Sequence, residues 1–321
     1  VTGVAKALEM MTSGEPIGSA EALACGLVDK VADAEGHDAL LAAAVAFARQ
    51  VLAEGRPLTR IRDRSDKLAH DPAVFADIRQ KIAHRTRGFL APEYNIRCIE
   101  AAATLPFDEG LAVERKLFGE LMSGTQSKAQ QYYFFAEREA AKIPDLPKDT
   151  AITKVAKAGV LGGGTMGGGI AMNFANAGIP VTIVERDEES LARGLSVIRK
   201  NYERSAARGS ISSDDVGTRM ALIGGSTDKG VFHDCDIVVE AVFEDLELKK
   251  SVFAEFDAIA KPGAILASNT SALDVNAIAA ATTRPESVIG THFFSPANVM
   301  KLCEVVRGEK TSPEVIASTM A

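Results

Sequence analysis

The chain has 321 residues, enough for two domains of ordinary size, and its 46% hydrophobic and 25% charged residues are typical of a globular protein. Its formal net charge of −7 argues against non-specific binding to nucleic acid, because such a surface repels phosphates. Four scattered cysteines without metal-ligand spacing predict no metal site, and the longest apolar stretches, such as 39–48, fall short of the roughly 20 residues that a membrane span needs.

The first region, residues 1–145, is predicted to be mostly helical. It is rich in Ala, Leu, Glu and Arg, with apolar residues at helical spacing and almost no β-branched runs. Leu111, Phe118 and Leu121, for example, are expected to lie along one apolar stripe of a helix. The chain starts without a Met and ends in what resembles the opening of a helix, so we interpret both ends as cuts in a longer protein.

A second region begins after the stretch 142–150 (KIPDLPKDT), whose prolines and charges predict a linker. From there, short apolar strands alternate with helices, which predicts a doubly wound, mostly parallel sheet covered on both faces at 151–321. The clearest helices are expected at 188–208 and 246–260, and the strands at 155–162, 180–185, 221–225, 236–242, 264–269, 288–294 and 303–308.

The Gly-rich segment after the first of these strands carries the pattern Gly162-x-Gly164-x-x-Gly167. Gly162 permits a tight turn, Gly164 leaves room for a pyrophosphate beside the backbone, and Gly167 lets the following helix pack close to the strand. Unpaired amides at the helix N-terminus would then stabilise the pyrophosphate charge. Thr165 and Met166 belong to the same loop and are assigned with the glycines to cofactor binding. A Gly-rich turn without a ligand is the alternative.

Glu185 ends the next strand, about 20 residues after the glycines, where a carboxylate accepts hydrogen bonds from the adenosine ribose hydroxyls. Arg186 beside it could pair with the 2′-phosphate of NADP, but the Glu185 carboxylate would repel that phosphate. The two residues together therefore favour NAD over NADP. A solvated strand end is the alternative for Glu185 taken alone.

Oxidation of a secondary alcohol requires a base for the hydroxyl proton, a group that orients this base, and donors that hold the substrate oxygen. His292 ends one predicted strand, Glu304 lies on the next, and Ser271 and Asn269 lie in a polar turn after a third. Each has a simpler interpretation: a packed core histidine, an edge-exposed glutamate, or a serine that caps the following helix. Spacing alone leaves these alternatives open, and we expect Ser271 to form that cap in either case.

Residues 153–321 closely resemble the NAD-binding domain of the 3-hydroxyacyl-CoA dehydrogenases, because the Gly-rich loop, SNTSAL, HFFSPA and KLCEVV follow in matching order. The resemblance implies that His292 is the catalytic base, that Glu304 is its carboxylate partner, and that Ser271 contacts the substrate oxygen. The loop here reads Gly-Gly-Gly where many relatives have Gly-Ala-Gly.

The same resemblance implies that Glu244 and Lys249 lie near the cofactor, and Asn269 is assigned to cofactor binding with them. In that family a further Asn and a helical domain follow the NAD-binding domain; the helical domain completes the substrate cleft and mediates dimerisation. Both are expected beyond Ala321.

Two N-terminal motifs, at 11–31 and 107–139, resemble the enoyl-CoA hydratase/isomerase (crotonase) family. That family's catalytic carboxylates lie upstream of both motifs and are therefore expected before Val1. The order hydratase then dehydrogenase matches bifunctional fatty-acid β-oxidation enzymes. The resemblance implies an acyl-CoA substrate, a bacterial cytoplasmic or a peroxisomal location, and a possible homo-oligomer or thiolase partner in the full-length protein.

Three other hypotheses stay open. The chain could bind NAD with little or no turnover, because half of the cleft is expected beyond Ala321. It could be a CoA-independent, NAD-dependent hydroxyacid dehydrogenase, although HFFSPA and KLCEVV speak against this. Residues 1–145 could carry lyase activity, which the missing carboxylates disfavour.

Overall fold

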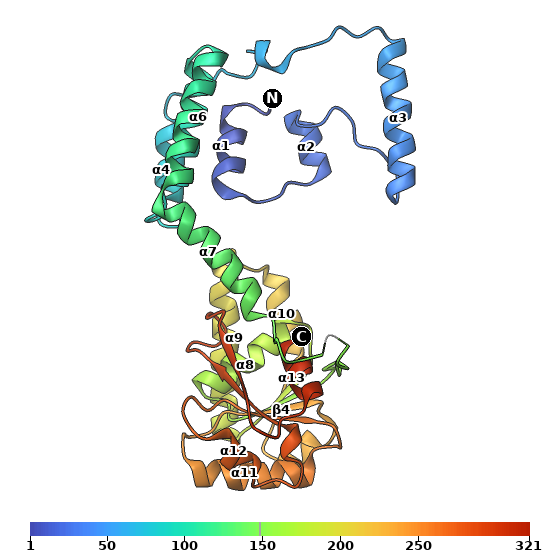
Figure 1. The fold of residues 1–321 in the computed structure, drawn as a ribbon, viewed down its shortest axis with the longest axis vertical. Coiled ribbons are helices and arrows are strands. Elements are labelled where there is room, and N and C mark those ends of the chain that lie inside the picture. The colour runs from blue at the N-terminus through green and yellow to red at the C-terminus, as the bar shows by residue number, and fades with distance from the viewer. Residues whose placement is uncertain (148) are drawn as a thin grey trace. The chain divides into compact units, whose positions relative to one another are not determined.

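The chain forms two compact units, Val1–Ala140 and Ala141–Ala321, in a computed structural model that describes residues 1–147 and 149–321 (Figure 1). Lys148, which falls in the predicted linker, lies outside the described residues. Each unit has its own buried core, so each is described by itself.

The first unit is helical, as the sequence predicts, and its residues 1–140 contain no strand. It holds one short 3₁₀ turn at Ile61–Asp63 and the following α-helices: α1 (Val4–Ser13), α2 (Ser19–Cys25), α3 (His37–Ala53), α4 (Val74–Ile82), α5 (Ala91–Thr104), α6 (Phe107–Ser123) and α7 (Thr125–Ala140).

The core of this unit lies between α1, α4 and α5, and α6 packs on α5 through a different stripe from the predicted one. Leu117 is buried, and a Cβ at Gly110 would lie 3.4 Å from the carbonyl oxygen of Ala101. Gly110 and Leu117 are seven residues apart and therefore share a face, whereas Phe118 is turned about 100° further around the helix. Leu111, Phe118 and Leu121 all lie along one side of α6, as predicted, but Phe118 is 63% exposed, so this side is not buried at Phe118.

The second unit is built on a sheet of seven strands in the order β3-β2-β1-β4-β5-β6-β7. Neighbouring strands from β3 to β6 pair in parallel, and only β7 runs antiparallel to its neighbour β6. The strands are β1 (Ala158–Leu161), β2 (Val181–Val184), β3 (Ile223–Ser226), β4 (Ile237–Glu240), β5 (Ile265–Ser268), β6 (Val288–Phe293) and β7 (Cys303–Arg307). The predicted mostly parallel, doubly wound sheet is confirmed.

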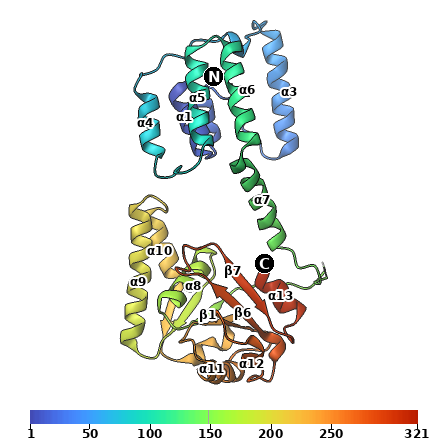
Figure 2. The same cartoon turned by 60° about the vertical axis from the view of Figure 1, so that its left-hand side comes forward.

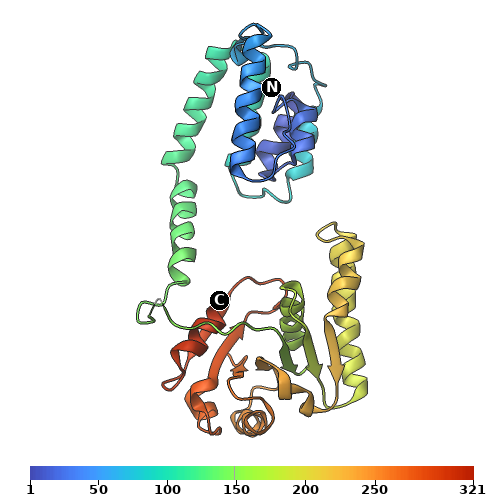
Figure 3. The ribbon, with the colours of Figure 1, turned by 90° about the vertical axis from the view of Figure 1, so that its right-hand side faces the viewer.

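Helices cover both faces of this sheet (Figures 2 and 3). They are α8 (Thr165–Asn176), α9 (Glu188–Ala207), α10 (Ser213–Ala221), α11 (Leu246–Ile259), α12 (Val275–Ala279) and α13 (Pro313–Met320), with 3₁₀ turns at Lys229–Asp234 and Pro285–Ser287. Strands β1, β4 and β5 are buried along their whole length because both faces are covered.

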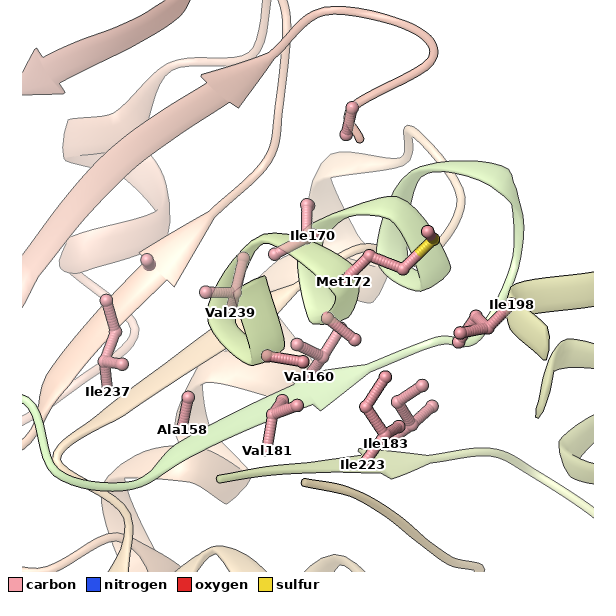
Figure 4. Packing of buried hydrophobic residues seen from close by; sticks show 14 of the residues in the cluster. Ala158, Val160, Ile170, Met172, Val181, Ile183, Ile198, Ile223, Ile237 and Val239 are labelled. Atoms are coloured by element: carbon pink, nitrogen blue, oxygen red, sulfur yellow. The ribbon is translucent and has the colours of Figure 1, made fainter. Parts of the chain in front are cut away.

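Two apolar cores result, one on each face of the sheet. The first joins β1 and β2 to α8 and α9, with Val160, Ile170, Ile183 and Ile198 at its centre (Figure 4). The second joins the opposite face to α11 and α12, and Phe253 and other aromatic rings of this layer are fully buried in it. Together the cores fix the strand ends, where ligands bind in sheets of this kind.

The strand order reverses between β1 and β4, since the chain leaves β1 toward β2 and β3 and then returns to the other side. Such a switch point opens a crevice at the carboxyl ends of the strands. The Gly-rich loop follows β1 at this point, and the segment 241–245 follows β4 beside it.

Candidate functional site

The Gly-rich loop between β1 and α8 is too tightly packed for side chains at two of its glycines. Gly162 has a φ of +97°, and a Cβ there would lie 2.7 Å from the carbonyl oxygen of Ala241. A Cβ on Gly167 would lie 1.9 Å from the carbonyl oxygen of Gly162. Gly164 is different, because nothing lies within 4 Å of the place of its Cβ. The backbone at Gly164 is therefore open to a ligand.

The first turn of α8 offers free amide groups to an anion. Among the described residues, no side chain caps this helix at Gly164. The N–H groups of the first helical turn, from Thr165 onward, then have no intrahelical partner, and the helix dipole favours negative charge there. The loop thus fits the pyrophosphate of a dinucleotide, and Thr165 and Met166 lie where the sequence places them.

Glu185 follows β2 directly and is held at the rim of this loop. Its Oε1 accepts a hydrogen bond from the Gly163 amide at 2.7 Å, and its Oε2 accepts one from the Arg186 amide at 3.1 Å. The Arg186 side chain is 78% exposed and pairs with Asp187 instead of Glu185. A carboxylate is therefore fixed beside the loop, as recognition of ribose hydroxyls requires, while the neighbouring guanidinium is directed elsewhere.

His292 and Glu304 form a cross-strand pair at the end of the sheet. They are direct partners in the antiparallel register of β6 and β7, so their side chains lie on the same face. His292 Nδ1 lies 2.9 Å from Glu304 Oε2, and the exposed fractions of the two side chains are 20% and 54%. With Nδ1 engaged by the carboxylate, Nε2 is the ring nitrogen left to receive a proton.

A cavity of about 410 Å³ brings most of the predicted catalytic region together. Its lining includes Met166, Glu244, Asn269, Ser271 and His292. His292 therefore borders a cavity, unlike a packed core histidine. Met166 also lines a larger cavity of about 790 Å³ along the Gly-rich loop and Glu185, so the two spaces share a wall.

Ser271 does not cap the helix that follows, and that expectation is wrong. The N-cap of α12 is Asp274, whose side chain accepts from the Asn276 amide. Ser271 donates instead to Glu244 Oε1, through its amide at 3.0 Å and its hydroxyl at 3.3 Å, and Thr270 Oγ1 donates to the same oxygen at 2.6 Å. The polar turn at 270–271 is thereby hydrogen-bonded to the segment after β4.

A buried ion pair lies behind Glu244. Lys249 is 1% exposed, and its Nζ lies 2.6 Å from Glu240 Oε1 and 3.3 Å from Glu244 Oε2. Glu240 is fully buried and also accepts hydrogen bonds from Ser268 Oγ and the Val242 amide. Sequence reasoning missed Glu240, although a single acidic residue inside the apolar run 237–242 was the available signal.

The electrostatics of this group keep Glu244 ionised. Burial alone would raise its pKa, but hydrogen bonds from Thr270 and Ser271 and the charge of Lys249 outweigh burial and hold the pKa of Glu244 below its usual value. Asn269 completes the frame, since its Oδ1 accepts from the Phe293 amide at 3.0 Å and so joins the ends of β5 and β6.

In the described residues, no helix is both long enough and apolar enough to cross a membrane. Nor does any cluster of three or more His, Cys, Asp or Glu side chains in that part of the chain have the arrangement of a metal site.

Comparison with known proteins identifies relatives of both units. The chain is 42% identical to the peroxisomal bifunctional enzyme of Cavia porcellus over 325 residues, covering 99% of this chain and 44% of that protein. It is 39% identical to the peroxisomal bifunctional enzyme of Homo sapiens, covering 100% of this chain and 44% of that protein. The chain thus spans less than half the length of these curated relatives, and the match runs through both units.

Solved structures of dehydrogenases match about half of the chain. The dehydrogenase part of multifunctional enzyme 1 from C. elegans is 33% identical, with a TM-score of 0.51, and the match covers 56% of this chain and 41% of that one. The (S)-3-hydroxybutyryl-CoA dehydrogenase of Ralstonia eutropha is 34% identical, with a TM-score of 0.51, and the match covers 52% and 59% of the two chains.

The family model described as "3-hydroxyacyl-CoA dehydrogenase, NAD binding domain" matches residues 157–321, just over half of the chain. This range begins one residue before β1 and contains the whole sheet, the Gly-rich loop and the His292–Glu304 pair. The chain belongs to the 3-hydroxyacyl-CoA dehydrogenase family, and residues 157–321 are its NAD-binding domain.

Proposed function

We propose that residues 151–321 take part in the NAD-dependent oxidation of 3-hydroxyacyl-CoA to 3-ketoacyl-CoA, within a bifunctional β-oxidation enzyme that also has enoyl-CoA hydratase activity. The observation that carries the proposal is the His292–Glu304 pair, which borders a cavity that shares Met166 with the space along the Gly-rich loop. A base and a dinucleotide cradle are thereby adjacent on one sheet.

In this reaction NAD would accept the hydride that leaves the substrate carbon. The residues proposed to hold it are the loop and rim residues Gly162, Gly164, Thr165, Met166, Gly167 and Glu185, with Glu244, Lys249 and Asn269 on the inner side. Of the inner residues, Lys249 is buried, so we propose that it acts by fixing Glu244.

His292 is proposed to take the hydroxyl proton at Nε2. Glu304 accepts the hydrogen bond from Nδ1, which fixes the tautomer and stabilises the imidazolium that forms. Ser271 is proposed to donate its hydroxyl to the substrate oxygen. Its present acceptor, Glu244 Oε1, is 3.3 Å away and already receives two shorter hydrogen bonds, so this donor is the least engaged of the three.

The two units have different roles in this proposal. Residues 1–145 would be the C-terminal part of a crotonase-like domain with linker helices, and 151–321 the dehydrogenase NAD-binding domain. The two curated relatives from Cavia porcellus and Homo sapiens are named peroxisomal bifunctional enzymes, which favours a peroxisomal location; these two relatives give no support to the bacterial cytoplasmic alternative. A homo-oligomer or a thiolase partner remains a proposal for the full-length protein.

The substrate class separates the proposal from its nearest rival, a hydroxyacid dehydrogenase that does not use CoA. The complete protein that contains these residues should form NADH from (S)-3-hydroxybutyryl-CoA and not from free 3-hydroxybutyrate. Equal rates with the free acid would favour the rival. If the purified chain binds NAD by calorimetry but the complete protein oxidises neither substrate, the domain is a binding module and the proposed activity fails.

A further inference from the structure

The large apolar ring of Phe243 is exposed to solvent at the edge of the cofactor cleft. It lies in the segment 241–245 between β4 and α11, and 84% of it is exposed. Single exposed apolar residues are common on protein surfaces and need no explanation by themselves. Two observations distinguish this one: the rigidity of its backbone and its place between two cavities.

The backbone on both sides of the ring is fixed by hydrogen bonds. The Val242 amide donates to the buried Glu240 carboxylate at 2.8 Å, and the Asp245 amide donates to the Phe243 carbonyl oxygen at 2.9 Å. Asp245 in turn caps α11 by accepting from the Leu248 amide at 2.8 Å. Because this turn is already ordered, little backbone entropy is lost when a ligand covers the ring. The contact between ring and ligand can therefore contribute almost fully to the binding affinity.

The same ring lines two neighbouring cavities, of about 460 Å³ and about 790 Å³. The other residues common to both linings are Gly164 and Thr165 of the loop and helix start, together with Glu185 and Arg186 at the end of β2. The larger cavity continues to Leu248 and Val252 on α11, which give it an apolar wall. Phe243 therefore shares its space with the residues proposed to bind the pyrophosphate and the adenosine ribose.

We propose that the Phe243 ring is the apolar contact surface for the adenosine half of NAD and thereby sets cofactor affinity. The inference rests on the proposed function, since it takes NAD as the ligand and Glu185 as the partner of the adenosine ribose. Every base has a flat π-face, and contact with an aromatic ring removes both surfaces from water. No hydrogen bond is required for this contribution, which explains a phenylalanine at an otherwise polar rim.

The test is calorimetric titration of the purified chain with NAD and, separately, with ADP-ribose, which lacks the nicotinamide. Phe243→Ala should weaken both ligands by the same factor, roughly 5- to 100-fold, as expected for loss of one base–aromatic contact. Phe243→Tyr keeps the ring and should stay within about twofold of the unmutated chain, since only an exposed hydroxyl is added. Phe118→Ala, which removes a 63% exposed ring from the first unit, should change neither affinity.

Each outcome decides between distinct accounts. Unchanged affinity of Phe243→Ala for ADP-ribose would overturn the inference, whether or not NAD binding weakens, because the ring would then lie outside the adenosine half. If the unmutated chain binds neither ligand, the proposed function itself fails, and the inference fails with it. Thermal unfolding of each variant should be unchanged, because Phe243 lies outside the buried cores.

Discussion

Glu185, Glu240 and Glu304 are carboxylates at the carboxyl-end region of one sheet, but each is held by a different kind of partner. Glu185 accepts from a loop amide, Glu240 from a buried ammonium, and Glu304 from an imidazole. The partner decides what each carboxylate can do. A neutral amide orients the carboxylate without adding a charge, whereas a buried ammonium group stabilises its ionised form. An imidazole partner makes the carboxylate part of a proton-transfer site.

The choice between NAD and NADP is predicted to depend on Glu185. Glu185→Ala removes the carboxylate that would repel a 2′-phosphate and leaves Arg186 beside the loop. We expect NAD affinity to fall and the preference for NAD over NADP to narrow, as measured by calorimetry with both cofactors. Glu185→Asp is the matched control, because it keeps the charge. Equal or tighter binding of NADP than of NAD by the unmutated chain would contradict this assignment.

Glu304 is predicted to act through His292 and not through substrate binding. Glu304→Gln keeps the size of the side chain but removes the charge that stabilises the imidazolium. In the complete protein we expect kcat to fall while the affinity for NAD stays unchanged, because Glu304 lines none of the cavities along the Gly-rich loop. An equal loss of NAD affinity would instead indicate a structural role for Glu304.

At the scale of elements, the buried Glu240–Lys249 pair joins β4 to α11. Removing one partner of a buried ion pair typically costs about 3–5 kcal/mol, because the other charge stays buried and unpaired. We therefore expect Lys249→Met to lower the free energy of unfolding by this order in denaturant titrations. Adding Glu240→Gln should restore part of it, since the unpaired charge is then gone. Additive losses in the double variant would show that the two residues are not coupled.

The pattern of elements could be predicted from the sequence because buried parallel strands are continuous apolar runs. The runs 236–242 and 288–294 contain β4 and β6, and the helix expected at 188–208 matches α9 within one residue. Predictions of local features were wrong where a residue outside the segment determines the local structure. Ser271 was the wrong cap because Asp274 lies closer to α12 and Glu244 attracts the Ser271 hydroxyl.

The candidate site could be predicted only in part, for a related reason. The cross-strand pairing of His292 with Glu304 depends on the antiparallel direction of β7, which the apolar pattern of 303–308 does not specify. Lys249 lies three and four residues before Val252 and Phe253 on α11, so helical spacing indicates that it faces the core, but not that Glu240 is its partner. Burial is set by the packing of α11 on the sheet, a property of the whole unit.

At the scale of the whole molecule, contacts of the segment 141–150 decide at which residue an independently folding NAD-binding domain begins. Ile143 and Leu146 pack against the first core of the second unit, and Asp145 pairs with Arg307 on β7 at 2.7 Å. A fragment 141–321 should therefore have a higher free energy of unfolding in denaturant titrations than a fragment 151–321. The difference should be on the order of 1–3 kcal/mol, as expected for two partly buried side chains. Equal stabilities would show that 151 is the true start of the domain.

The central claim is that this domain oxidises a 3-hydroxyacyl-CoA with His292 as the base, and one comparison tests it most directly. NADH formation from (S)-3-hydroxybutyryl-CoA is measured for the complete protein and for its His292→Ala variant, with NAD affinity measured in parallel by calorimetry. Loss of a general base typically costs roughly 10²–10⁴ in rate. The account predicts a loss of at least that order with nearly unchanged NAD affinity. A His292→Ala variant that keeps most of its rate would contradict it.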